Sequence, residues 1–381
     1  MNLHCWYRCL LLGGIVAGPL QAQKIKLTVP VPELEVRAQR DSNDAAAHYN
    51  LAMGYLSKDR FGAAEASLRQ AIALDPQFAD AYLALSIAHE KDGDFWRAKR
   101  KAGPDSVRAA IRELDRQYTK AFLLDPLVDV RVLGSIVWLR PWGEFASGLK
   151  DLVEGKYPTA YTHFSNEVRH QQKGGNLEDV PQVLLWFRSL AAAHSELPDS
   201  AAADLQLLVA RTERQVAVDS APDGAPLRVN EYRYMLAAIR QRQGRTAEAT
   251  ELYQQVITAD IGNYMAHVQL ARMYEAARDF PRAVQERMSA VDANPEDPSL
   301  LLDLGVTLGK AGMLPQAEAR LKLASEANPR DPRAFYWLGL AQMDLGKSAE
   351  ARATLSRFLE LAPSRYEHQI SVARERLTRL Q

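Results

Sequence analysis

The sequence predicts an all-α protein in which helical hairpins stack side by side as a solenoid. Prolines stand 34 residues apart, at Pro295, Pro329 and Pro363. Each interval between them contains two stretches in which apolar residues recur every three or four positions, which is the pattern of an amphipathic helix. A glycine, Gly312 or Gly346, separates the two stretches and suits the left-handed turn that ends a helix. A fixed period of this length predicts units that bury their apolar faces against their neighbours.

Small residues recur where the two helices of each hairpin must touch. In four consecutive units of 34 residues, a leucine in the first helix precedes a glycine or an alanine, and the second helix carries an alanine. The leucines are Leu236, Leu270, Leu304 and Leu338, and the alanines are Ala249, Ala283, Ala317 and Ala351. A small side chain permits close approach of two backbones. This spacing predicts four regular repeats at residues 230–363.

The pattern resembles that of the tetratricopeptide repeat (TPR) family, whose unit is a helix–turn–helix of the same length. The resemblance rests on the leucine with its small neighbour, the alanine and the closing proline, in phase over four units. It implies a right-handed solenoid of about eight repeats, counting weaker upstream copies. It also implies a concave wall lined by the first helices, and a non-catalytic role as a scaffold that binds a protein or an extended peptide.

The repeats at residues 44–126 contain an insertion. The interval between prolines grows from 34 to 50 residues between Pro76 and Pro126, so the second repeat of this pair holds extra residues. Asp105 and Ser106 follow a glycine and a proline there, and both residue types are good helix caps. We therefore expect an additional helix that is capped by Asp105 or Ser106.

The other segment boundaries follow from changes in pattern. Pro30 and Pro32 favour an extended segment. Ile370, Ala373 and Leu377 lie along one side of a helix whose other faces are charged, as expected of a terminal cap. The predicted segments are an extended linker at 23–43, a divergent repeat pair at 141–217, a loop at 218–229 and a capping helix at 364–381.

Residues 1–22 have the pattern of a secretory signal. Arg8 precedes a largely apolar run that ends at Leu20, and Gln21 and Ala22 offer a cleavage point. The run is about a dozen residues long, whereas a membrane span needs roughly 20. We expect cleavage after Ala22, export to the periplasm or the extracellular space, and no membrane span afterwards. An uncleaved membrane anchor is the alternative.

Residues 127–140 interrupt the repeats with an apolar run that includes Val132 and Trp138. The run is too short to span a membrane. We expect a buried connector that packs on its neighbours. Contiguous apolar surface also marks contact sites, so the alternative is a structural protein that self-assembles into a homo-oligomer through this segment.

Composition argues against several functional classes. The chain has 47 basic and 47 acidic residues, and nucleic-acid binding depends mainly on excess positive charge. Both cysteines, Cys5 and Cys9, lie in the predicted signal, which leaves no thiol for a disulfide or a zinc site. Spacings typical of zinc proteases, calcium loops and serine hydrolases are missing. We expect no enzymatic activity, no metal, no cofactor and no nucleic-acid partner.

The implied concave wall gives a candidate binding surface. At about 100° per residue, the first helix of each repeat turns one stripe of side chains away from the hairpin core. Aromatic and aliphatic residues bordered by charges suit an extended peptide with mixed side chains. The candidate groove residues are Asn50, Met53, Met235, Gln269, Arg272, Asp303, Val306, Arg333, Tyr336, Trp337 and Leu340.

Two alternatives to a peptide groove stay open. Tyr336 and Trp337 would pack under the C-terminal helix, because aromatic residues on helices are often part of the core. A closed pocket in the concavity would instead indicate a receptor for a small ligand.

Overall fold

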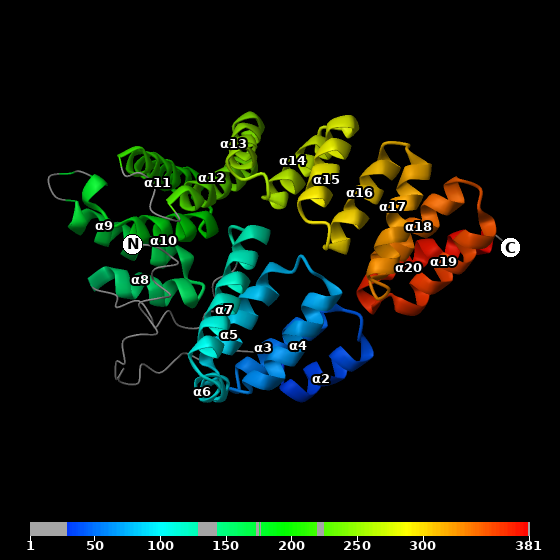
Figure 1. Ribbon diagram of the computed structural model, residues 1–381, viewed down its shortest axis with the longest axis horizontal. Coiled ribbons are helices and arrows are strands. Elements are labelled where there is room, and N and C mark those ends of the chain that lie inside the picture. Colours follow the sequence, from blue (N-terminus) through cyan, green and yellow to red (C-terminus); the bar gives the residue numbers. More distant parts are fainter. Residues whose placement is uncertain (1–28, 129–142, 173–174, 176, 219–224, 380–381) are drawn as a thin grey trace. The chain divides into compact units, whose positions relative to one another are not determined.

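The computed structural model describes residues 29–128, 143–172, 175, 177–218 and 225–379 (Figure 1). The regular structure in these ranges is helical, so the predicted all-α class is confirmed. The predicted signal and most of the predicted connector, including Val132 and Trp138, lie outside the described residues.

The chain divides into two compact units, which are described separately. Unit 1 contains Leu56–Gly62 and Ala79–Asp260. Unit 2 contains Leu27–Tyr55, Ala63–Phe78 and Ile261–Gln381. The helices of unit 1 are α5 (Ala79–Lys91), α6 (Gly93–Ala102), α7 (Pro104–Leu124), α8 (Gly143–Val153), α9 (Tyr157–Gln171), η3 (Leu177–Asp179), α10 (Gln182–His194), α11 (Pro198–Val218), α12 (Ala225–Arg242) and α13 (Thr246–Ala259).

The helices that lie wholly or mainly in unit 2 come from both ends of the sequence. They are α2 (Val31–Arg40), α3 (Ala45–Leu56), α4 (Phe61–Leu74), α14 (Tyr264–Ala276), α15 (Phe280–Ala293), α16 (Pro298–Lys310), α17 (Leu314–Ala327), α18 (Pro332–Asp344), α19 (Ser348–Leu361), η4 (Ser364–Tyr366) and α20 (Glu367–Arg379). A segment near the N-terminus therefore belongs to the same compact unit as the last three repeats.

Consecutive helices pack as hairpins, as a solenoid of repeats requires. The packed pairs are α5 with α7, α8 with α9, α10 with α11, α12 with α13, α14 with α15, α16 with α17 and α18 with α19. These pairs make seven hairpins in the described residues, as expected of a solenoid of helical repeats. The predicted turn glycines Gly312 and Gly346 have φ values of 76° and 75°, the left-handed conformation that glycine adopts without strain. Gly244, between α12 and α13, has a φ of 72°.

The small residues of the first helices allow the close contact that the sequence predicts. A methyl group added at Gly305 on α16 would lie 2.5 Å from Leu321 Cγ on α17. One added at Gly339 on α18 would lie 2.6 Å from Leu355 Cδ2 on α19. Leu355 is fully buried. Glycine therefore sets the distance between the two helices of these hairpins.

The last hairpin is covered by α20. Ala373 on this helix is fully buried, and it forms a cluster with Leu355 and Phe358 of α19. Ile370 and Leu377 of α20 pack against the same cluster. The predicted capping helix thus buries the apolar side that the final repeat leaves uncovered.

Three local predictions are corrected. The linker at 23–43 is not extended throughout, because α2 forms at Val31–Arg40 with a proline in its first turn, where the missing N–H costs nothing. The insertion contains α6, capped by Asp92, and α7 begins at Pro104 after Gly103, so Asp105 and Ser106 are not the caps. The loop predicted at 218–229 is shorter, because α11 continues to Val218 and α12 begins at Ala225.

Candidate functional site

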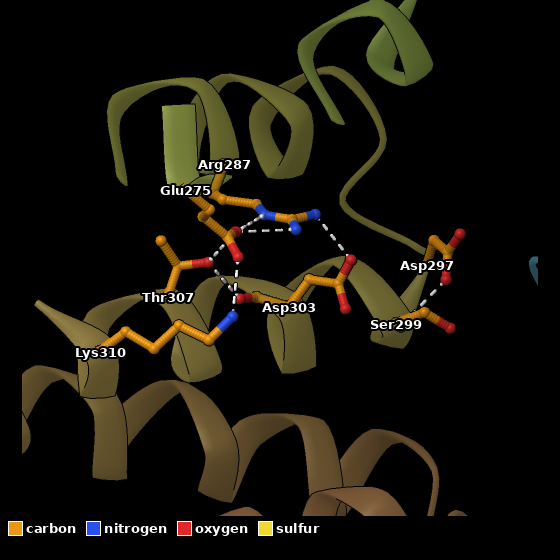
Figure 2. Close-up of polar contacts among 7 residues, drawn as sticks. All are labelled: Glu275, Arg287, Asp297, Ser299, Asp303, Thr307 and Lys310. Atoms are coloured by element: carbon orange, nitrogen blue, oxygen red, sulfur yellow. Dashed lines mark hydrogen bonds and ion pairs between the residues drawn. The ribbon is translucent and has the colours of Figure 1, made fainter. Parts of the chain in front are cut away.

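A network of charged side chains joins two consecutive repeats of unit 2 (Figure 2). Arg287 of α15 is 5% exposed and lies between two carboxylates. Its Nη2 donates a hydrogen bond to Glu275 Oε1 of α14 at 2.9 Å, and its Nη1 donates to Asp303 Oδ2 of α16 at 2.6 Å. The guanidinium therefore links the first helices of two neighbouring repeats.

Two further residues complete the coordination of Glu275. Thr307 Oγ1 donates to Glu275 Oε1 at 2.7 Å, and Lys310 Nζ donates to Glu275 Oε2 at 2.8 Å. Both donors lie on α16. The network contains two cations and two carboxylates, so its formal charges balance. Such a network is suited to fixing the register of α14 against α16 rather than to binding an ion.

The network was not anticipated from the sequence, although one signal was present. Ala283, Arg287 and Ala290 stand four and three residues apart on α15 and are all buried. A charged residue on the apolar side of a helix indicates a buried partner, because burying an unpaired charge is very costly. The identity of the partners could not be read from this pattern.

The charge network makes the stability of unit 2 depend on pH. Burial raises the pKa of Glu275, but hydrogen bonds from Lys310 and Thr307 and the charge of Arg287 outweigh burial and lower this pKa below its ordinary value. A carboxylate whose pKa is lower in the folded state than in the unfolded state stabilises the folded state at pH values above its unfolded pKa, which is about 4.3 for glutamate. This stabilisation is lost as the pH falls through the pKa of the folded state. We expect the urea concentration at the midpoint of unfolding to decrease as the pH is lowered below about 4.3. This decrease should be less steep in Glu275→Gln. Equal slopes for the two proteins would contradict this account.

The candidate groove residues separate into groups by their environment. Met53 and Met235 are 9% and 4% exposed, and Met235 belongs to the apolar core of unit 1. The prediction that these two face a groove is therefore corrected. Counting about 100° per residue around one helix shows which side faces away from its hairpin partner. It cannot show whether another helix covers that side.

Three more candidates are engaged in contacts of their own. Asp303 pairs with Arg287. Val306 is half-buried and packs against the apolar cluster that contains Leu304 and Leu338. Arg333 lies 2.8 Å from Asp331 and 3.8 Å from Asp75. Asp303 and Arg333 therefore already have charged partners within the chain.

The two aromatic candidates on α18 have different roles. The ring of Tyr336 lies 5.1 Å from that of Phe358 and packs against the cluster under α20. Burial raises the pKa of its hydroxyl above the ordinary value. Trp337 stands edge-on to Tyr336 at 5.3 Å and is 39% exposed. Tyr336 thus packs under the C-terminal helix, whereas Trp337 presents an accessible ring.

The remaining candidates are accessible side chains on first helices. Asn50 on α3 and Arg272 on α14 are exposed, and Gln269 on α14 and Leu340 on α18 are half-buried. We call Gln269, Arg272, Trp337 and Leu340 the first-helix surface. It combines an aromatic ring and an aliphatic side chain, which can contact apolar side chains of a peptide, with an amide and a cation, which can form hydrogen bonds to it.

The comparison with protein families identifies the repeats. A family model described as a tetratricopeptide repeat matches residues 49–98, 234–298 and 302–366. These three ranges are tetratricopeptide repeats. The three matches contain α4, α5, α13 to α15 and α17 to α19 in full and α3, α6, α12 and α16 in part, and they include every residue of the first-helix surface.

Several solved structures are similar to this chain. The C-terminal part of a TPR repeat-containing protein from Cytophaga hutchinsonii is 15% identical, with a TM-score of 0.48 over 58% of this chain and 81% of that chain. MamA from Desulfovibrio magneticus RS-1 is 16% identical, with a TM-score of 0.39 over 47% and 94% of the two chains. MamA AMB-1 is 20% identical, with a TM-score of 0.38 over 50% and 97%. The comparison with curated proteins gave no match.

Within the residues that the structure describes, no three side chains of histidine, cysteine, aspartate or glutamate come together as a metal ion would require. None of the helices there has the length and apolar character that crossing a membrane demands.

Proposed function

We propose that this chain is a non-catalytic scaffold that binds a protein or an extended peptide along the first helices of its C-terminal repeats. The observation that carries the proposal is the exposure of Trp337. This ring remains accessible on a well-packed helix, although α20 covers the adjacent Tyr336. Accessible tryptophan on a rigid element is typical of residues that dominate binding energy.

The family supports the same proposal. Tetratricopeptide repeats are generally non-catalytic scaffolds, and solenoids of this kind use extended surfaces to bind other proteins. The charge network of Glu275, Arg287 and Asp303 fixes α14 against α16, and so holds Arg272 in a defined position before a partner binds. Such preorganisation reduces the entropic cost of association.

Two hollows on the described part of the chain do not have the form of a small-ligand site. One lies on α12 and α13, beside Arg233 and Thr258, and has a volume of about 410 Å³. The other lies along η4 and α20, beside Ile370 and Arg374, with a volume of about 390 Å³. Neither includes a residue of the first-helix surface, and both are open to solvent, unlike the closed sites that enclose small ligands.

Export is a further part of the proposal. It rests on residues 1–22, whose charge and apolar run suit a secretory signal. N-terminal sequencing of the mature protein tests it. We expect the sequence to begin at Gln23, and a start at Met1 or before Gly18 would contradict export by cleavage of this signal.

Truncation of Trp337 tests the binding surface. We expect Trp337→Ala to weaken binding of native partners about tenfold or more, because removing an exposed anchor residue typically costs about 2 kcal/mol or more of binding energy. The melting temperature should change little, since the ring is partly exposed. Quantified recovery of partners from native extract, together with thermal unfolding, measures both effects.

Leu323→Ala is the matched control, because Leu323 is 45% exposed on α17, a second helix. This variant should recover partners as well as the wild type does. Unchanged recovery by Trp337→Ala would reject the surface. A large fall in its melting temperature would assign Trp337 to packing.

A further inference from the structure

A short acidic segment between α2 and α3 binds the last repeat of the same unit. We call residues 41–44, with the sequence Asp-Ser-Asn-Asp, the DSND segment. Its partners follow α17 and stand 287 to 323 positions later in the chain. All of these residues belong to unit 2.

The middle of the DSND segment is held through its backbone and an amide. Arg330 Nη2 donates to the carbonyl oxygen of Ser42 at 3.1 Å, and Arg330 Nε donates to Asn43 Oδ1 at 3.2 Å. Asn43 Nδ2 donates to the carbonyl oxygen of Leu361 at 3.3 Å. Leu361 ends α19, where helix carbonyls have no partner within the helix. Asn43 therefore donates a hydrogen bond to a helix-terminal carbonyl that would otherwise bond only to water.

The two ends of the DSND segment are held through carboxylates. The backbone N–H of Ser364 donates to Asp41 Oδ1 at 3.2 Å, and Arg365 Nε lies 2.9 Å from Asp44 Oδ1. Burial raises the pKa of Asp41, but hydrogen bonds from Ser364 and Arg40 lower it overall, so this carboxylate is charged at neutral pH. Every residue of the segment thus makes a specific polar contact with the last repeat or its C-terminal extension.

The receiving residues form a cationic surface. A third acidic side chain, Asp75 at the end of α4, lies 3.8 Å from Arg333. Arg330, Arg333 and Arg365 therefore each face an oxygen from the N-terminal part of unit 2, and we call these three residues the arginine surface. Guanidinium groups that bind a backbone carbonyl, an amide and carboxylates are a common way for proteins to recognise an acidic peptide.

The contact is well suited to opening. It consists of polar interactions, and in the pair of Arg365 with Asp44 the arginine side chain is 51% exposed and the carboxylate side chain 12%. Exposed ion pairs each contribute only about 0.2–1 kcal/mol and weaken with salt. The contacts named above between the segment and the last repeat are polar, so added salt should weaken them.

We infer that the arginine surface is a binding site for acidic peptide segments of partner proteins, and that the DSND segment is its built-in occupant. An external segment with carboxylates on both sides of an amide makes the same contacts once the DSND segment has left. The internal segment competes at the high effective concentration that a covalent link provides. This site goes beyond the proposed function, because it does not use the first-helix surface and it specifies the chemistry of the partner.

A synthetic peptide tests the inference. The probe is a fluorescein-labelled peptide with the sequence of residues 38–47, AQRDSNDAAA. It is titrated against the full-length chain and against the full-length variant Asp41→Asn, Asn43→Ala, Asp44→Asn, with fluorescence anisotropy as the readout. Asparagine at position 44 retains the helix cap that Asp44 provides through its bond to the N–H of Ala46. The variant should therefore release the segment without unfolding α3.

We expect the variant to bind the peptide at least tenfold more tightly than the wild type does, with an affinity that falls as salt is added. Adding Arg330→Ala and Arg365→Ala to the variant should weaken binding at least tenfold. A control peptide that carries the same three substitutions as the variant should not bind. Trp337→Ala should leave peptide binding unchanged, so the outcome is independent of the proposed first-helix surface.

Hydrogen exchange of the Ser364 amide shows whether the segment has been released. Faster exchange in the variant, combined with no peptide binding, would overturn the inference. Equal affinity of the wild type and the variant would overturn the role of the DSND segment as occupant. Unchanged exchange in the variant would show that these contacts do not hold the segment, which also contradicts the inference.

Discussion

Replacing Arg287 by alanine is expected to destabilise unit 2 by about 3 kcal/mol, because the buried carboxylate of Glu275 would keep only Lys310 and Thr307 as donors. Glu275 and Asp303 would lose the guanidinium that lies between them. The register of α14 against α16 depends on this link. Chemical unfolding in urea, followed by far-UV circular dichroism, measures the change as a shift in midpoint.

The control for Arg287→Ala is Arg282→Ala on the same helix. Arg282 is 62% exposed; it pairs with Asp279 one turn earlier, and its guanidinium lies 4.5 Å from the centre of the Tyr274 ring. Its removal should change the midpoint little. Combining Arg287→Met with Glu275→Leu should recover part of the loss, because apolar residues of similar size can replace a buried pair. Similar midpoints for Arg287→Ala and Arg282→Ala would show that the network contributes little.

Two glycines on α16 are expected to respond in opposite directions to the same substitution. An alanine at Gly305 would place its methyl group 2.5 Å from Leu321 Cγ and 3.2 Å from Leu321 N, so the helices must move apart. Overpacking of this kind costs about 1–3 kcal/mol. An alanine at Gly309 would lie 4.0 Å from Ala317 Cβ, an ordinary contact. Replacing glycine by alanine within a helix otherwise stabilises it by about 0.5–1 kcal/mol.

Urea unfolding of the two alanine variants distinguishes a steric clash at Gly305 from a destabilisation that any substitution on α16 would cause. Gly305→Ala should lower the midpoint, and Gly309→Ala should leave it unchanged or raise it. The two residues share one helix, so differences in helix propensity cancel. A fall of the same size in both variants would contradict the proposed role of Gly305 in setting the distance between α16 and α17.

The hairpins could be predicted because their determinants are local. The proline period, the turn glycines and residues such as Gly305 and Leu338 act within a single repeat or between adjacent ones. Pro32 favours an extended segment in the sequence but lies in the first turn of α2 in the structure, because a proline suits that position of a helix equally well. Local patterns therefore established the class of the fold but not each boundary.

The binding surface could be predicted only in part, because exposure depends on neighbours that are distant in sequence. The same helical projection selected Met235, which is buried, and Trp337, which is exposed. The contact of Asn43 with Arg330 and Leu361 has no counterpart in the repeat pattern, since it joins the first hairpin to the last. Tertiary packing alone brings such residues together.

Site-specific photo-crosslinking in the native host tests the central claim most directly. A photoreactive amino acid is placed in turn at positions 272 and 337 on first helices, and at positions 288 and 323, where Met288 and Leu323 are 48% and 45% exposed on second helices. We expect the same protein partner to be linked from 272 and 337 and not from 288 and 323. Adducts that form only from 288 and 323 would contradict binding through the first helices.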